Sequence, residues 1–143
     1  MIDQEPTLIK STFRENLDMA HRYSDDELGK ILKECNLWSF IEDKGGLEAS
    51  VSNNSLSTGE KQLLCICRAF LKQSKVVLID EATANIDVKN DSLIQGVIAD
   101  KFRESTVFTI AHRLSTTESS DRIMVMDQGE LVEFGDPLQL KNR

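Results

Sequence analysis

In the first half of the chain, apolar residues recur at the interval of one face of an amphipathic helix. The first stripe comprises Leu28, Ile31, Leu32 and Cys35. Ser24 and Glu27 precede this stripe with the spacing of a capping box, so we expect a helix to begin there. A second helix is expected to begin at Ser57, where a glutamate again follows three residues on. Its apolar stripe comprises Leu63, Leu64, Cys67, Phe70 and Leu71.

After about residue 74 the pattern changes to continuous apolar runs separated by a helical stripe. The runs at 76–79 and 106–110 are typical of strands buried in a parallel sheet. A helix is expected between them over about 90–102, and its inward face comprises Leu93, Ile94, Val97, Ile98 and Phe102. A strand over 122–126, a turn at 127–129 and a second strand over 130–134 predict a hairpin. The pattern indicates an α/β fold with a mostly helical part, residues 1–74, and a sheet-containing part, residues 75–143.

Composition and charge narrow the class of protein. A length of 143 residues fits one domain or one part of a larger one. The net charge of −7 and the isoelectric point near 4.8 argue against nucleic acid as a partner, because no basic patch is available to neutralise phosphates. The three cysteines are too few for a disulfide framework and suit buried, reduced thiols. No run approaches the roughly 18 apolar residues of a membrane span, and residues 1–6 do not resemble a signal peptide.

Two acids stand at the end of the first apolar strand. Asp80 falls at its carboxyl end, where open α/β sheets place their ligands, and a carboxylate there can hold Mg²⁺. Glu81 follows directly and points in a different direction, so it can act as the general base for an attacking water. Taken alone, the pair is also compatible with an ordinary strand end.

The remaining candidates are weak one by one. The segment Ser57–Gly59 opens a helix whose free amides and dipole can bind an anion, although, taken alone, a plain capped helix is the favoured explanation because capping boxes are common. His112 comes just after the second apolar strand, where a histidine is more often structural. Gln4 lies in a loop before Pro6, and Asp87 fits a helix cap or a turn. Their order and spacing, however, match one family.

The chain resembles the nucleotide-binding domain of ATP-binding-cassette (ABC) transporters over essentially its whole length. The matching segments are Leu56–Gln62 for the signature motif, Val77–Thr83 for Walker B, Ala84–Asp87 for the D-loop, Ala111–Arg113 for the switch histidine, Asp121–Glu130 for the usual ending and Gln4 for the Q-loop. A closer resemblance is to the second nucleotide-binding domain of subfamily C, the multidrug-resistance-associated type. It rests on Arg14–Asp18, Tyr23–Asp25, Gln62–Cys65 and Ala84–Asp87.

The resemblance implies the P-loop NTPase (ABC ATPase) fold in incomplete form. The chain would supply the Q-loop and helical subdomain in residues 1–74 and the C-terminal half of the parallel-sheet core in residues 75–143. No Gly-x-x-x-x-Gly-Lys-Ser/Thr loop occurs in these 143 residues, and the resemblance places that P-loop before Gln4. We therefore expect apolar faces of the strands at 76–79 and 106–110 to be partly uncovered.

The resemblance also implies a role for each site residue. Asp80 would hold Mg²⁺ with help from Gln4, Glu81 would activate water, and His112 would contact the γ-phosphate of ATP. The signature residues Ser57, Thr58, Gly59 and Glu60 would contact ATP bound to the opposite domain, and Asp87 would couple the two sites. The implied partners are a second nucleotide-binding domain, paired head to tail, and the transmembrane domains of a membrane exporter of organic anions or drug conjugates.

Two positions depart from the family's Leu-Ser-Gly-Gly-Gln signature. Thr58 stands for the first glycine and Glu60 for the glutamine, so we expect the site served by this signature to be altered. The resemblance implies an ATP hydrolase when the chain is part of a complete domain, and an inactive fragment in isolation. The alternative is a catalytically inactive half-domain that acts as an interaction or regulatory module for a complete partner. Soluble family members of DNA repair fit less well, because they insert a long coiled coil between the Q-loop and the signature, whereas only about fifty residues separate Gln4 from Ser57 here. A translation factor is disfavoured by the subfamily C-like segments and by the acidic charge.

Overall fold

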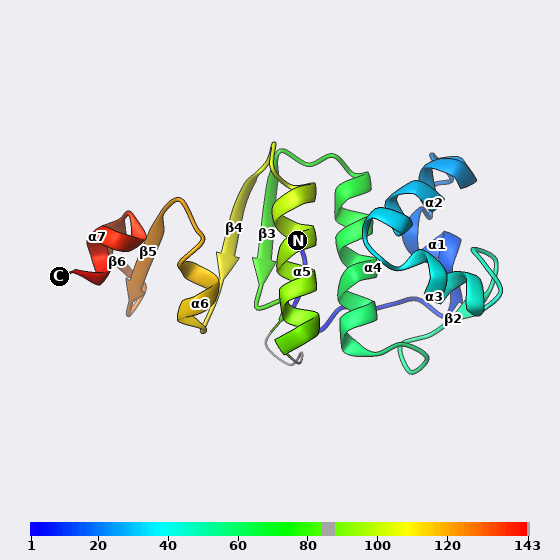
Figure 1. Ribbon diagram of the computed structural model, residues 1–143, viewed down its shortest axis with the longest axis horizontal. Helices are drawn as coiled ribbons and strands as arrows, with labels where there is room; N and C mark the ends of the chain where they lie inside the picture. The colour runs from blue at the N-terminus through cyan, green and yellow to red at the C-terminus, as the bar shows by residue number, and fades with distance from the viewer. Residues whose placement is uncertain (84–87, 143) are drawn as a thin grey trace. The chain divides into compact units, whose positions relative to one another are not determined.

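The computed structural model describes residues 1–83 and 88–142, which form two compact units, Met1–Thr109 and Ile110–Arg143 (Figure 1). The elements up to the end of the first unit are β1 (Ser11–Thr12), α1 (Phe13–Leu17), α2 (Asp25–Glu34), α3 (Trp38–Asp43), β2 (Ser50–Val51), α4 (Thr58–Leu71), β3 (Val76–Asp80), α5 (Val88–Lys101) and β4 (Thr106–Ile110). The second unit contains α6 (Leu114–Thr117), β5 (Ile123–Asp127), β6 (Glu130–Gly135) and α7 (Pro137–Lys141). The mixed α/β character is as predicted from the sequence.

Both predicted capping boxes are present. At the start of α2, the Ser24 amide donates to the Glu27 carboxylate at 2.8 Å, and the Glu27 amide donates to Ser24 Oγ at 3.3 Å. The same pair of bonds opens α4, with Ser57 as the N-cap. Each pair satisfies backbone donors that the first helical turn would otherwise leave unpaired, which is why both helices begin where the sequence indicated.

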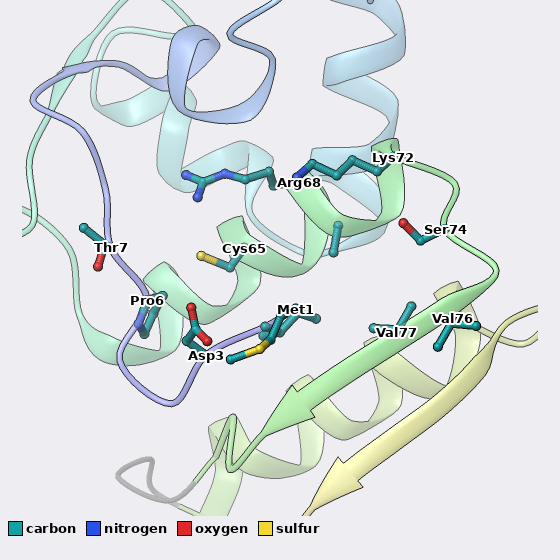
Figure 2. A pocket seen from close by; sticks show the side chains of 12 residues that line it. Met1, Asp3, Pro6, Thr7, Cys65, Arg68, Lys72, Ser74, Val76 and Val77 are labelled. Atoms are coloured by element: carbon teal, nitrogen blue, oxygen red, sulfur yellow. The ribbon is translucent and has the colours of Figure 1, made fainter.

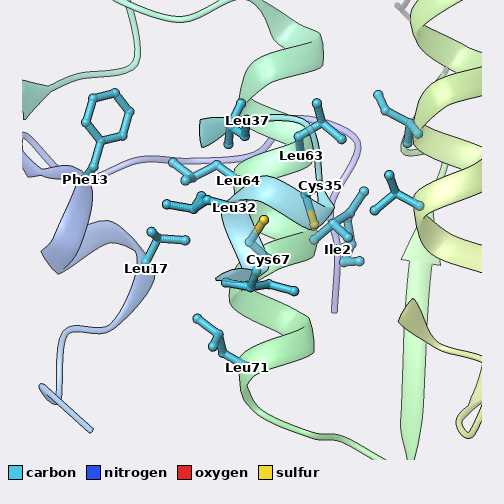
Figure 3. Packing of buried hydrophobic residues seen from close by; sticks show 14 of the residues in the cluster. Ile2, Phe13, Leu17, Leu32, Cys35, Leu37, Leu63, Leu64, Cys67 and Leu71 are labelled. Atoms are coloured by element: carbon cyan, nitrogen blue, oxygen red, sulfur yellow. The ribbon is translucent and has the colours of Figure 1, made fainter. Parts of the chain in front are cut away.

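The core of the first unit is built around α4 (Figure 3). Its apolar stripe packs against α1 and α2 on one side and against α5 on another. The predicted apolar stripe of α2 is fully buried. That of α4 is also buried except for Phe70, which is half-buried. The ring of Phe70 meets that of Phe102 edge to face, with 6.3 Å between the ring centroids.

The buried cysteines Cys35 and Cys67 form no disulfide. The hydrogen bond between their thiols, together with burial, raises the pKa of Cys67. A thiol in this state is a poor nucleophile.

Strand β3 lies between β4 and the N-terminal residues. β3 and β4 pair and run in the same direction (Figure 1), as expected for a β-helix-β unit. On its other side, Ile2 forms a parallel bridge with Ile79. The predicted subdomain boundary near residue 74 stays a prediction, although it falls where the helical segment gives way to this sheet.

Burial along β3 alternates, which corrects the expectation of a strand buried on both faces. Val77 and Ile79 are buried, whereas Val76 and Leu78 are 57% and 48% exposed. In β4, Phe108 and Ile110 are exposed as well. These exposed apolar side chains agree with the expectation of partly uncovered apolar faces on both strands.

Helix α5 buries a narrower face than predicted. Ile94, Val97, Ile98 and Phe102 are buried, but Leu93 is 36% exposed, so its inward assignment was wrong. The four buried positions form one stripe, and Leu93 lies about 100° of helical rotation from Ile94, at the edge of that stripe. Because α5 is covered on one side, a residue at that edge remains accessible to water.

The second unit contains the predicted hairpin. β5 and β6 pair antiparallel, with Asp127 opposite Glu130. The two connecting residues, Gln128 and Gly129, have φ values of 46° and 84°. Two consecutive positive φ angles are the mark of a type I′ turn, which suits the twist of a tight hairpin. None of the helices within 1–83 and 88–142 is long and apolar enough to cross a membrane.

Candidate nucleotide site

The two acids at the end of β3 lie in a bent stretch of backbone. Asp80 is the last residue of the strand and is half-buried. Glu81 follows with a φ of 43°, in the left-handed region that side chains other than glycine rarely occupy. Such a conformation costs about 1–3 kcal/mol and is concentrated at functional sites. The chain therefore accepts strain at the position where the sequence predicts the general base.

The structure brings the segment that carries Gln4 to the same end of β3. The Asp80 amide donates to the carbonyl oxygen of Ile2 at 2.9 Å, and the Ile2 amide donates to that of Leu78 at 2.8 Å. From helix α4, the Nε2 atom of Gln62 donates hydrogen bonds to the carbonyl oxygens of Asp3 and Gln4. Gln4 itself is half-buried. The proposed Mg²⁺ ligands, Asp80 and Gln4, thus come from adjoining segments.

The start of α4 offers hydrogen-bond donors to an anion. The Ser57 amide donates to Glu60 Oε2 at 2.8 Å, and the Glu60 amide donates to Ser57 Oγ at 3.2 Å. The helix itself supplies no acceptor for the next two amides, those of Thr58 and Gly59. Ser57 and Thr58 are exposed, and Gly59 and Glu60 are half-buried. A phosphate reaching this helix start would meet an exposed hydroxyl and two free amides.

The two remaining predicted site residues, His112 and Asp87, are not among the described residues of the first unit. His112 is exposed and lies in the second unit, between β4 and α6. Asp87, with the rest of the D-loop segment at 84–87, lies outside the described residues. The first unit therefore places the segment that carries Gln4 against the end of β3 and against Gln62 of α4, and the role of His112 stays a prediction.

The donors at this site suit Mg²⁺ and a phosphate. A carboxylate and an amide oxygen are ligands that this hard cation accepts. No group of three or more His, Cys, Asp or Glu suited to a metal ion occurs among the residues that the structure describes. Mg²⁺ is usually held by one or two carboxylates together with substrate phosphates.

A cavity of about 250 Å³ lies elsewhere in the first unit (Figure 2). Its lining comes from the N-terminal segment, the C-terminal half of α4 and the start of β3, including Arg68, Lys72 and Val76. The guanidinium of Arg68 is engaged, since its Nε donates to the carbonyl oxygen of Asn16 at 2.7 Å. None of the predicted site residues lines this cavity, and β3 enters it with the end opposite to Asp80. We therefore do not assign it to the nucleotide.

Reasoning from the sequence missed Gln62. Its side chain is fully buried, although it stands in the apolar half of a helix next to Leu63 and Leu64. A glutamine in such a place is a signal in itself, because a buried polar side chain is retained when it has hydrogen-bond partners. The identity of those partners, two backbone carbonyls far away in sequence, could not be read from the chain.

Comparison with known proteins identifies the family of this chain. The family model described as ABC transporter matches residues 1–84. The chain is 46% identical over 143 residues to ATP-binding cassette sub-family C member 4 of Mus musculus, which covers 98% of this chain and 11% of the relative. It is 45% identical over 146 residues to a probable multidrug resistance-associated protein of Drosophila melanogaster, with 100% and 11% covered. A third relative, ATP-binding cassette sub-family C member 2 of Mus musculus, is 46% identical over 143 residues, with 98% and 9% covered.

The chain thus spans about a tenth of the length of these relatives. None of the three is described as an inactive or regulatory module, so the comparisons give no support to that alternative. The P-loop NTPase fold class expected from the sequence is confirmed by the family match. The chain belongs to the ABC transporter family, as part of an ATP-binding domain of the subfamily C type.

Proposed function

We propose that this chain carries the water-activating and signature-bearing part of an ATPase that drives export of organic anions or drug conjugates across a membrane. One observation carries the proposal. The acid pair at the end of β3, in which Glu81 has a left-handed backbone, lies beside the segment that carries Gln4, the Q-loop segment. That segment is hydrogen-bonded both to β3 and to α4, the signature helix, which begins with the signature residues. An ATPase needs these parts held in one rigid group, because catalysis of phosphoryl transfer is mostly positioning and electrostatics.

Each residue has a distinct part in the proposed reaction. Asp80 and Gln4 would hold Mg²⁺, which would supply positive charge to neutralise the phosphates. Glu81 accepts a proton from the attacking water, since its carboxylate follows directly on the Mg²⁺ ligand. His112 donates a hydrogen bond to the γ-phosphate oxygens, where charge changes during transfer. The cradle for the phosphates is a P-loop, a motif that these 143 residues do not contain.

The proposed partners follow from the exposed start of α4. Ser57, Thr58, Gly59 and Glu60 bind ATP held by a second nucleotide-binding domain, and Asp87 links the two sites. ATP then has higher affinity for the paired domains than for the separate ones, and this difference drives their closure. Transmembrane domains convert the closure into transport, which places the ATPase at a membrane. The names of the relatives, among them a multidrug resistance-associated protein, support an exporter.

The first test is to isolate the native polypeptide with an antibody to residues 20–50 and determine its mass and peptides. We expect a mass far above the 16.1 kDa of this chain, with peptides from a P-loop and from membrane spans. A native band at about 16 kDa would contradict the proposal.

The second test is ATP turnover by that polypeptide with Mg²⁺. Glu81→Gln removes the proposed base and keeps the shape of the side chain, so turnover should be abolished. Glu104→Gln is the matched control, because it makes the same change at an exposed acid after α5 and should leave turnover intact. Equal turnover in the parent and in Glu81→Gln would overturn the assignment of the base.

A further inference from the structure

Gln62 joins the signature helix to the Q-loop segment. It lies in the second turn of α4, and its side chain is 0% exposed. Its Nε2 atom donates one hydrogen bond to the carbonyl oxygen of Asp3 at 2.9 Å and another to that of Gln4 at 3.0 Å. Both hydrogens of the amide nitrogen are therefore used.

The other end of the same side chain is unsatisfied. Gln62 Oε1 is buried and has no hydrogen-bond partner within the described ranges. A buried acceptor left unpaired opposes folding, and an apolar side chain of similar size would carry no such penalty. The value of the amide must then lie in its two donors. These two hydrogen bonds hold the backbone of residues 3 and 4 in place, and the Gln4 side chain extends from that backbone.

A further hydrogen bond connects the same N-terminal segment to Asp80. The carbonyl of Ile2 accepts from the Asp80 amide at 2.9 Å, and residues 3 and 4 are the next two in the chain. The Gln4 segment is thus fixed on one side by the end of β3 and on the other by α4. These hydrogen bonds are the direct connection between β3, the segment and α4, because Ile2 and Asp3 also line the cavity of about 250 Å³ and packing there is not continuous.

We propose that Gln62 is a positioning residue that transmits movement of the signature helix to Gln4. When the start of α4 binds ATP held by the opposite domain, the shift of the helix moves the Asp3 and Gln4 carbonyls with it. The Gln4 side chain is thereby set against the site formed by Asp80. This inference rests on the proposed ATPase function, and it adds a route by which occupation of one site sets the geometry of the other.

The test uses the complete native polypeptide and Mg-ATP. Gln62→Met keeps the length of the side chain and removes both donors. We expect kcat for ATP to fall by about 2-fold to 30-fold, the range found for residues along coupling networks, with KM for ATP unchanged. The matched control is Leu63→Ala, which weakens packing of the same helix and touches neither carbonyl. It should lower the thermal stability and leave kcat per folded molecule intact.

A double-mutant cycle separates positioning from a general loss of structure. If Gln62 acts through Gln4, then Gln62→Met should add little to the loss already caused by Gln4→Ala, whereas independent effects would multiply. Where Gln62→Met does not accumulate as folded protein, Gln62→Leu, which also removes both donors and leaves an apolar side chain, takes its place. Failure of both variants to fold would assign the bonds to folding and overturn the inference.

The outcomes distinguish this inference from the proposed function. A parent polypeptide without turnover, or one unaffected by Glu81→Gln, contradicts the proposed function itself. An active parent whose Gln62→Met variant matches it in kcat contradicts the positioning role alone. So does a variant whose only change is a raised KM, or one that loses no more turnover than Leu63→Ala.

Discussion

At Gly59, what folding requires of the signature motif can be tested separately from what ATP binding requires. It is in the first turn of α4, and a Cβ atom built on it would lie 3.8 Å from Cβ of Asn90, an ordinary van der Waals contact. Its φ is not in the left-handed region. An alanine therefore fits without strain, and it should stabilise the fold by about 0.4–1 kcal/mol, because it restricts the unfolded chain. Folding alone does not require a glycine here.

The measurement is the free energy of unfolding of the 143-residue chain in urea, followed by the fluorescence of Trp38, its single tryptophan. Gly96→Ala is the control, since Gly96 is an exposed position inside α5 with no atom within 4 Å of the added Cβ. It should stabilise by a similar amount. A Gly59→Ala variant that is less stable than the parent by 1 kcal/mol or more, on the scale of these backbone effects, would refute our account of the local geometry.

The same variants in the complete polypeptide test function. If the backbone of Gly59 approaches a phosphate of the opposite site, the added methyl group displaces that phosphate. A misplacement on the order of 1 Å can lower turnover about 100-fold. Gly96→Ala should have no such effect. A Gly59→Ala variant that is more stable and equally active would show that close backbone approach is not what this position provides.

Two other predictions concern the helix starts. In the complete polypeptide, Thr58→Gly combined with Glu60→Gln should preserve or raise the ATPase rate, because the change restores the family's glycine and removes a negative charge; a clear loss of rate would count against this. In α2, hydrogen bonds from the Ser24 backbone and side chain hold the pKa of Glu27 below its ordinary value. A depressed folded-state pKa means that the stabilisation is present above the unfolded pKa and is lost as pH falls through the folded one. Titration of the Glu27 carboxyl by NMR should show the low pKa, and Ser24→Ala should raise it; an ordinary pKa in the parent would contradict the capping box.

The local structure was predictable where one residue type satisfies a local need. Ser24 and Ser57 start helices because a hydroxyl and a carboxylate three residues later satisfy free amides, and both are visible in the sequence. The hairpin turn at Gln128 and Gly129 is equally local. The order of the site motifs along the chain was sufficient to identify the family.

What the sequence left open depends on contacts between distant segments. Leu93 has the apolarity of its neighbours, and its exposure follows from which side of α5 is covered. The alternating burial of β3 has the same origin, since Val76 and Val77 differ in what lies above them and not in chemistry. The partners of Gln62 are 58 and 59 positions away, so no local pattern could have indicated them.

The structure also bears on the altered signature motif. A glutamate in place of glutamine puts a negative charge at a helix start that is proposed to bind phosphate, and repulsion would follow if the carboxylate faced the ligand. Here the carboxylate instead accepts from the Ser57 amide at 2.8 Å. The charge interacts favourably with the helix dipole, by about 0.3–1 kcal/mol, while the Thr58 and Gly59 amides stay available. A glutamine oxygen could accept the same hydrogen bond, so the cap does not require the charge. With the carboxylate in this position, the substitution would weaken phosphate binding by charge repulsion and would leave the amides accessible. High salt, which screens repulsion between exposed charges, should then narrow the difference in ATP affinity between the parent and Glu60→Gln.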